Sequence, residues 1–119
     1  MRDHRKLRAF ELADSLVLSV YSATTSFPRE EQFGLTSQLR RSAVSVASNI
    51  VDGCARNSHP DYVRLLDVAF GSAQEMAYQL SVAARLQYLE SDVAPDLARQ
   101  ADELVRVLAG LLRSLRSES

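Results

Sequence analysis

The chain has 119 residues, of which 46% are hydrophobic and 24% charged, and its net charge at pH 7 is −1. This composition fits one globular domain with a single core, and the near-neutral charge excludes a general electrostatic attraction to nucleic acid or to membranes. The one cysteine, Cys54, excludes an intramolecular disulfide and predicts a cytoplasmic protein. No segment approaches the ~20 consecutive apolar residues of a membrane span, so no membrane partner is expected.

The first predicted helix covers about residues 6–26, where apolar and small residues recur at spacings of three and four. This stripe consists of Phe10, Ala13, Val17, Val20, Thr24 and Phe27. The pair Phe27-Pro28 predicts its end, because a residue that precedes proline disfavours the helical conformation.

The second predicted helix covers about residues 36–55. Leu39, Ala43, Val46 and Ile50 line one face, and Gly53 marks the approach of the C-terminus. From Ser42 to Ser48 no residue is larger than valine, which indicates close packing against another helix. We expect that helix to be the third one, where Gly71 would allow its backbone to come near.

The third predicted helix covers about residues 59–89, and the fourth about residues 93–116. Ser58, Pro60 and Asp61 form a strong start signal for the third helix, because serine caps, proline suits the first turn, and aspartate complements the helix dipole. The apolar residues of both helices keep a heptad spacing. Short connections and the absence of strand alternation predict an all-α, up-down-up-down four-helix bundle that forms one domain over residues 1–119.

An ordered set of residues resembles a known bacterial family of four-helix-bundle proteins, encoded in intervening sequences of 23S ribosomal RNA genes. The matching residues are Phe27, Pro28, Glu31, Phe33, Gly34, Leu35, Gln38, Arg40, Arg41, Ser42, Ala43, Ser45, Asn49, Ile50, Asp52, Gly53, Ala69, Gly71, Ser72, Glu75, Leu86, Tyr88 and Leu89. The resemblance covers about Leu7 to Leu89. Phe10 stands where the family usually has tryptophan, and Asp52 where it usually has glutamate; neither change threatens the fold.

The resemblance implies a left-handed bundle that assembles into a homopentamer, in a family whose molecular role is mostly not established. A related group, the accessory proteins of diversity-generating retroelements, is similar in fold; its members are strongly basic and bind nucleic acid and a reverse transcriptase. The net charge of −1 in this chain weakens the transfer of that nucleic-acid role.

A polar node of Arg41, Asn49 and Glu75 is predicted between the second and third helices. Asn49 would lie among apolar neighbours, where an unpaired polar group costs about 1–3 kcal/mol, so it needs partners. We interpret the node as a structural device that fixes helix register, with a ligand or catalytic site as the alternative.

Basic residues near the N-terminus form a second candidate site. Positive charge at a helix N-terminus opposes the dipole, so these residues either form a solvated end or contact phosphate groups. The candidate nucleic-acid contacts are Arg2, Arg5, Lys6 and Arg8, with Arg40 and Arg56 adding to them where exposed. Copies in a ring would strengthen a weak contact by avidity.

Enzymatic and metal-binding motifs are not found in the sequence. The two histidines, His4 and His59, do not belong to the Glu-x-x-His pairs of di-iron bundles. Cys54 and His59 are five residues apart, which suits half a metal site or a thiol–base pair, but a buried structural thiol is the favoured interpretation. The sequence therefore predicts no catalytic residue, no cofactor and no metal.

Several apolar side chains exceed what one narrow bundle stripe would bury, which usually marks an interface. They are Phe33, Val44, Val51, Tyr62, Tyr78 and Val82. Our first hypothesis is a cytoplasmic, non-enzymatic homopentamer that serves as an assembly or accessory protein, with itself, RNA, DNA or another protein as partner. The second is a nucleic-acid-binding module. The third is an enzyme or ligand-binding protein that uses the polar node.

Overall fold

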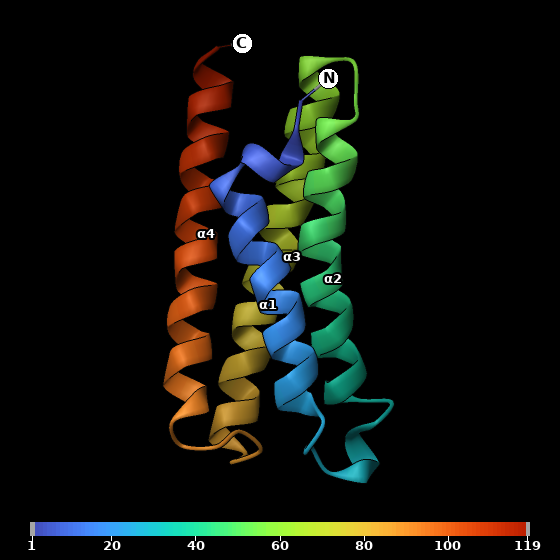
Figure 1. Ribbon diagram of the computed structural model, residues 1–119, viewed down its shortest axis with the longest axis vertical. Coiled ribbons are helices and arrows are strands. Elements are labelled where there is room, and N and C mark those ends of the chain that lie inside the picture. The colour runs from blue at the N-terminus through green and yellow to red at the C-terminus, as the bar shows by residue number, and fades with distance from the viewer. Residues whose placement is uncertain (1, 119) are drawn as a thin grey trace.

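The computed structural model describes residues 2–118, which form an all-α bundle of four long helices and two short 3₁₀ turns, with no strand in that range. The helices are α1 (Arg8–Thr24), α2 (Leu35–Cys54), α3 (His59–Arg85) and α4 (Val93–Ser117); the 3₁₀ turns are η1 (His4–Lys6) and η2 (Arg29–Glu31). Figure 1 shows the four helices side by side along the long axis of the molecule. The predicted all-α four-helix bundle is confirmed.

Each helix packs against the helices next to it in the chain, and α1 also packs against α4, so the bundle closes around one core. The core includes most of the predicted apolar residues, but in α1 Leu16 is buried, whereas Phe10 and Val17 of the predicted stripe are half-buried. Leu16, Leu39, Leu66, Met76 and Leu104 are all completely inaccessible to solvent. Burial of such side chains stabilises the bundle by about 1.5–3 kcal/mol per large residue, which exceeds the differences in intrinsic helix propensity between ordinary residues, about 0.7 kcal/mol at most.

Two predicted helix ends differ from the structure. α1 ends at Thr24, two residues early. α3 ends at Arg85, four residues before the predicted end, because Gln87 adopts a left-handed φ of 62°. The amide of Tyr88 donates to the Ala83 carbonyl oxygen at 2.9 Å, and the Gln87 amide to Ala84 at 3.0 Å. This pair of bonds is a Schellman motif, which stops a helix by satisfying its last carbonyl groups.

The start of α3 agrees with its sequence signal. The side chain of Ser58 accepts a hydrogen bond from the Asp61 amide at 3.2 Å, and Pro60 lies in the first turn. At the start of α2 the N-cap residue, Gly34, has no side chain to accept a bond, and the preceding 3₁₀ turn supplies the acceptor instead. Glu31 accepts a hydrogen bond from the Leu35 amide at 3.0 Å with one carboxylate oxygen, and from the Tyr88 hydroxyl at 2.9 Å with the other.

The close approach of α2 to α3 is found at a different glycine from the predicted one. A methyl group at Gly53 would lie 3.3 Å from Leu65 Cβ and 3.4 Å from a ring carbon of Tyr62. A methyl group at Gly71 would meet nothing within 4 Å outside its own helix, and Gly71 is exposed. The prediction that Gly71 admits the backbone of α2 was therefore wrong.

Candidate functional site

The predicted node of Arg41, Asn49 and Glu75 is not brought together by hydrogen bonds. The amide of Asn49 donates to the Ser45 carbonyl oxygen at 2.8 Å and to the Ser45 hydroxyl at 3.1 Å. Arg41 is exposed and donates to the Gln38 side chain at 2.9 Å, and Glu75 is exposed on α3. Arg41 lies eight residues from Asn49, about 12 Å along the helix, so the asparagine bonds to its own preceding turn instead.

Two serine-based contacts link α2 to α3 where the node was expected. The hydroxyls of Ser45 and Ser72 lie 2.8 Å apart, and the Ser42 hydroxyl lies 2.8 Å from Gln79 Oε1. Ser42 is 2% exposed and Gln79 9%, so this second contact is a buried polar pair in an otherwise apolar core. Sequence reasoning missed this pair; the available signal was a glutamine three residues after Met76 and directly before Leu80, next to the apolar stripe of α3. The pair favours one register of α2 against α3, because any other register would leave buried polar groups without a hydrogen bond.

The predicted basic residues near the N-terminus are mostly engaged within the chain. The amide of Arg2 donates to the Cys54 carbonyl oxygen at 3.1 Å, and its guanidinium lies 3.9 Å from the centre of the Tyr62 ring. Arg5 bonds to the Asp3 carboxylate at 3.0 and 3.1 Å, which lowers the pKa of that carboxyl group.

Two further basic residues form ion pairs on the same end of the bundle. Arg8 pairs with Glu103 of α4, and Arg56 bonds to both oxygens of Asp52, at 3.0 and 3.1 Å. Lys6 is exposed. The N-terminal residues are therefore held against the end of α2, and most of their charge is matched by a neighbouring carboxylate or aromatic ring.

Arg40 lies apart from the other predicted nucleic-acid contacts. Its guanidinium donates to the Thr24 hydroxyl at 2.8 Å and lies 4.7 Å from the centre of the Tyr21 ring. Arg56 lies 16 positions further along the chain, just past the end of α2, which corresponds to about 24 Å at the rise of a helix. The six predicted contacts therefore divide between two ends of the bundle and do not form one continuous basic surface.

Cys54 is a buried thiol that faces Tyr62, and His59 is turned elsewhere. Burial raises the pKa of the Cys54 thiol above its usual range and raises the pKa of Tyr62 to about 12. His59 Nε2 lies 3.0 Å from the Leu115 carbonyl oxygen of α4. The arrangement matches the structural interpretation of Cys54, because a thiol of raised pKa is a poor nucleophile at neutral pH.

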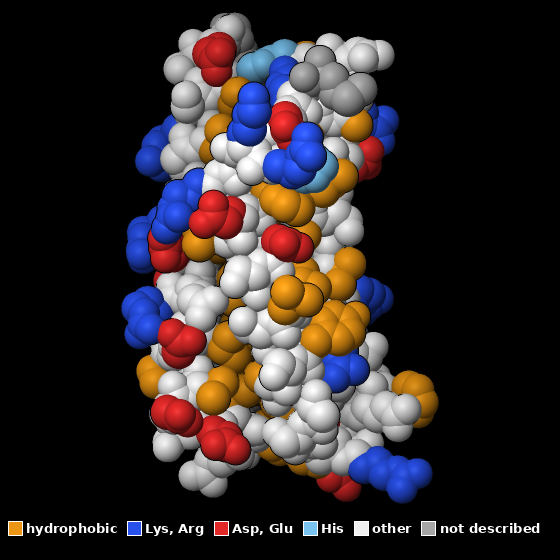
Figure 2. All heavy atoms as spheres, in the orientation of Figure 1, with side chains coloured by type: hydrophobic (Ala, Val, Ile, Leu, Met, Phe, Trp, Pro, Cys, Tyr) orange, Lys and Arg blue, Asp and Glu red, His pale blue; other side chains and the backbone are white. Residues whose placement is uncertain are grey.

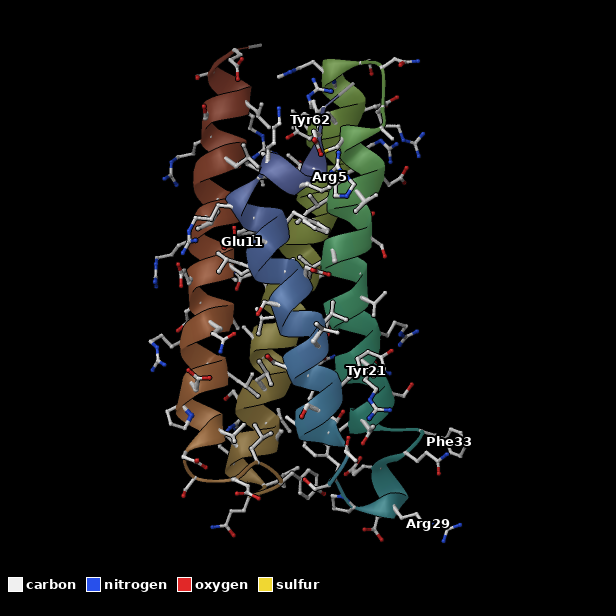
Figure 3. The ribbon with its side chains drawn as sticks, viewed as in Figure 1. Arg5, Glu11, Tyr21, Arg29, Phe33 and Tyr62 are labelled. Atoms are coloured by element: carbon white, nitrogen blue, oxygen red, sulfur yellow. The ribbon has the colours of Figure 1, made fainter. Side chains whose placement is uncertain are left out.

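One surface hollow is an open groove of about 650 Å³ between α1, α2 and the segment that connects them. Tyr21, Phe33, Arg40 and Val44 are among the residues that line it. Phe33 is 89% exposed, and Figure 3 shows it on the connecting segment, pointing away from the bundle. The groove has no buried charged group, so its geometry does not assemble a catalytic site.

Exposed apolar side chains are numerous, as expected, although not all are those predicted. Phe33, Val44, Val51 and Tyr78 are exposed, whereas Tyr62 is buried, with only 3% of its surface accessible. Leu18, Val68 and Leu86 are exposed as well. Figure 2 shows hydrophobic side chains gathered over α1 and α2, to the right of centre, and charged side chains gathered over α4 at the left.

Within residues 2–118, no group of three or more His, Cys, Asp and Glu side chains is placed to hold a metal ion. In the same range, no helix has the length and apolar character that crossing a membrane requires.

Comparison with known proteins gives a matching family and a solved structure of similar fold. The family described as 23S rRNA-intervening sequence protein matches residues 5–110. The fold is similar to that of a protein of unknown function from the S23 ribosomal protein family of Bacteroides thetaiotaomicron, with a TM-score of 0.78 at 19% identity. That likeness covers 87% of this chain and 97% of the other, and at this identity it shows a shared fold. A comparison with curated proteins finds no match.

Proposed function

Since the chain belongs to the 23S rRNA-intervening sequence protein family, we propose that it is a cytoplasmic, non-enzymatic homopentamer that serves as an assembly or accessory protein. The single observation that carries the proposal is the amount of apolar surface left outside the bundle. Tyr78 is 65% exposed, Leu18 70% and Phe33 89%. Exposed apolar patches on a small domain usually mark contacts with other proteins.

The pentamer and the left-handed, up-down-up-down arrangement are what the resemblance to this family implies. Light scattering on the eluate of a size-exclusion column tests the assembly. The proposal predicts a mass near five times the 13.2 kDa of one chain. A mass of one chain at every concentration would overturn it.

Direct nucleic-acid binding is the second candidate, as in the basic retroelement accessory proteins that this chain resembles in fold. Lys6 and Arg41 support it, because both are exposed and neither is in an ion pair among the described residues. Fluorescence anisotropy of labelled structured RNA and duplex DNA, at low and at physiological salt, tests this candidate. Binding that weakens steeply with salt would indicate phosphate contacts, whereas no binding at low salt would reject this candidate.

A ligand-binding or catalytic role for Arg41, Asn49 and Glu75 is the weakest candidate. The Asn49 amide is already engaged by Ser45, and the three side chains share no hydrogen bond. Such a role would need them to converge on one pocket, and the groove that Arg41 lines contains neither Asn49 nor Glu75.

A further inference from the structure

The outer surfaces of α2 and α3 differ from that of α4 in their charge. The exposed residues Arg99, Asp102, Arg106 and Arg113 follow one face of α4 at spacings of three, four and seven, as in an ordinary solvated face. By contrast, residues 42–51 of α2 carry no charged side chain, and residues 68–84 of α3 carry only Glu75. Depletion of charge, with aromatic residues and arginine retained, is typical of the centre of a protein interface.

Exposed residues on these two helices form two stripes with the same spacing. The α2 stripe consists of Arg41, Val44, Ser48 and Val51, and the α3 stripe of Val68, Gly71, Glu75 and Tyr78. Both follow steps of three, four and three residues, which place four side chains along one side of a helix. Two such stripes have the geometry that packs one helix against another.

The two stripes are complementary in charge and in shape. The only charged residue of the α2 stripe is Arg41, and the only one of the α3 stripe is Glu75. Gly71 is the smallest residue of the α3 stripe, and no contact within residues 2–118 explains a glycine at this position of a helix. A glycine in a helix interior is unfavourable compared with alanine, and it is kept where another backbone must come close.

We propose that the α2 stripe of one copy packs against the α3 stripe of a second copy. This inference rests on the proposed homo-oligomer and names its contact surface. Because the two stripes are different surfaces of one chain, the contact is heterologous, and repeating it closes a ring when the rotation between copies permits. With the two stripes antiparallel, Val51 lies against Val68 and Ser48 against Gly71, Val44 lies beside Glu75 and Tyr78, and Arg41 lies within one helical turn of Glu75.

Sedimentation velocity of three full-length variants tests the proposal. Val44→Glu blocks the α2 stripe, Tyr78→Glu blocks the α3 stripe, and Ala98→Glu is the control, since it adds the same charge at an exposed site of α4, outside both stripes. All three sites are exposed, so each variant is expected to keep the helical signal of the wild type. Each stripe variant is expected to sediment as a single chain, and the control is expected to keep the wild-type mass.

Mixing the two stripe variants gives the sharper readout. Val44→Glu keeps an intact α3 stripe and Tyr78→Glu an intact α2 stripe, so the mixture is expected to form a 1:1 dimer that does not grow. Failure of that dimer to form would overturn the pairing of α2 with α3. Charge reversal is a second readout: Arg41→Glu and Glu75→Arg should each weaken association by about tenfold or more, and the double variant should restore it.

The outcomes separate this inference from the proposed function. If the wild type is an oligomer and both stripe variants keep its mass, the oligomer stands and the contact surface proposed here is wrong. If the wild type is a single chain at every concentration, both proposals fall.

Discussion

The buried pair of Ser42 and Gln79 gives a stability prediction whose size follows from the structure. Replacing Ser42 with alanine removes the hydroxyl that lies 2.8 Å from Gln79 Oε1, in a site where Gln79 is 9% exposed. A buried acceptor without a partner costs about 1–3 kcal/mol, and alanine returns about 0.5 kcal/mol because it favours the helix more than serine. We therefore expect Ser42→Ala to lower the free energy of unfolding by about 0.5–2.5 kcal/mol.

Urea unfolding followed by circular dichroism at 222 nm measures this change, with the protein concentration held fixed because association adds to apparent stability. Ser81→Ala is the matched control, since Ser81 is an exposed serine on α3. Adding Gln79→Leu to Ser42→Ala removes both polar groups and should recover most of the loss. If Ser42→Ala is no less stable than Ser81→Ala, the pair does not stabilise the packing of α2 on α3.

Three further predictions concern single residues. Burial raises the pKa of Tyr62 to about 12, so the stability that its neutral hydroxyl contributes is complete below pH 10 and is lost as the pH rises through 12. Between pH 8 and pH 11 the free energy of unfolding of the wild type should therefore fall by about 1.4 kcal/mol more than that of Tyr62→Phe. Urea titrations of both proteins at both pH values measure this difference. Gly53→Ala should lower the melting temperature, because its methyl group would lie 3.3 Å from Leu65 Cβ. Gly110→Ala on α4 should raise the melting temperature, because it removes a helix glycine that costs about 0.5–1 kcal/mol. The reverse order of the two melting temperatures would contradict the packing described. Asn49→Leu removes the hydrogen bonds to Ser45, and because the site is half-buried we expect the free energy of unfolding to fall by about 0.5–1.5 kcal/mol in the same urea assay. A fall of more than about 3 kcal/mol would mean that Asn49 has partners other than Ser45.

The four helices were predictable from the sequence because local patterns decide them. Heptad spacing fixes which side of each helix is apolar, and the Ser58 cap is read from neighbouring residues alone. The end of α3 was not predictable in this way. It depends on the left-handed conformation of Gln87, a residue type that gives no such signal.

The candidate polar site was predicted on the right pair of helices but with the wrong partners. Asn49 and Ser45 belong to the contact region of α2, yet the bonds across to α3 come from Ser72 and Gln79. The rotation of each helix about its axis decides such pairs, and side chains of the whole core set that rotation. A spacing pattern locates a face to within about one residue, or 100°, which is not enough to choose between Glu75 and Gln79.

For the basic residues, too, the sequence shows where they lie along the chain but not which side chains pair with them. The sequence places Arg5, Arg8 and Arg56 near one end of the bundle but does not show that Asp3, Glu103 and Asp52 pair with them. Glu103 is 95 residues from Arg8 in the chain and meets it only because α1 and α4 are neighbours. Which basic residues remain unpaired on the surface therefore follows from the folded structure and not from the sequence alone.

The number of chains in the assembly tests the central claim most directly. Native mass spectrometry of the wild-type protein at several concentrations counts those chains without a shape assumption. A dominant species of five chains, each of 13.2 kDa, is the result that the proposed function predicts. A spectrum that contains only single chains at every concentration would contradict both the homopentamer and the contact of α2 with α3.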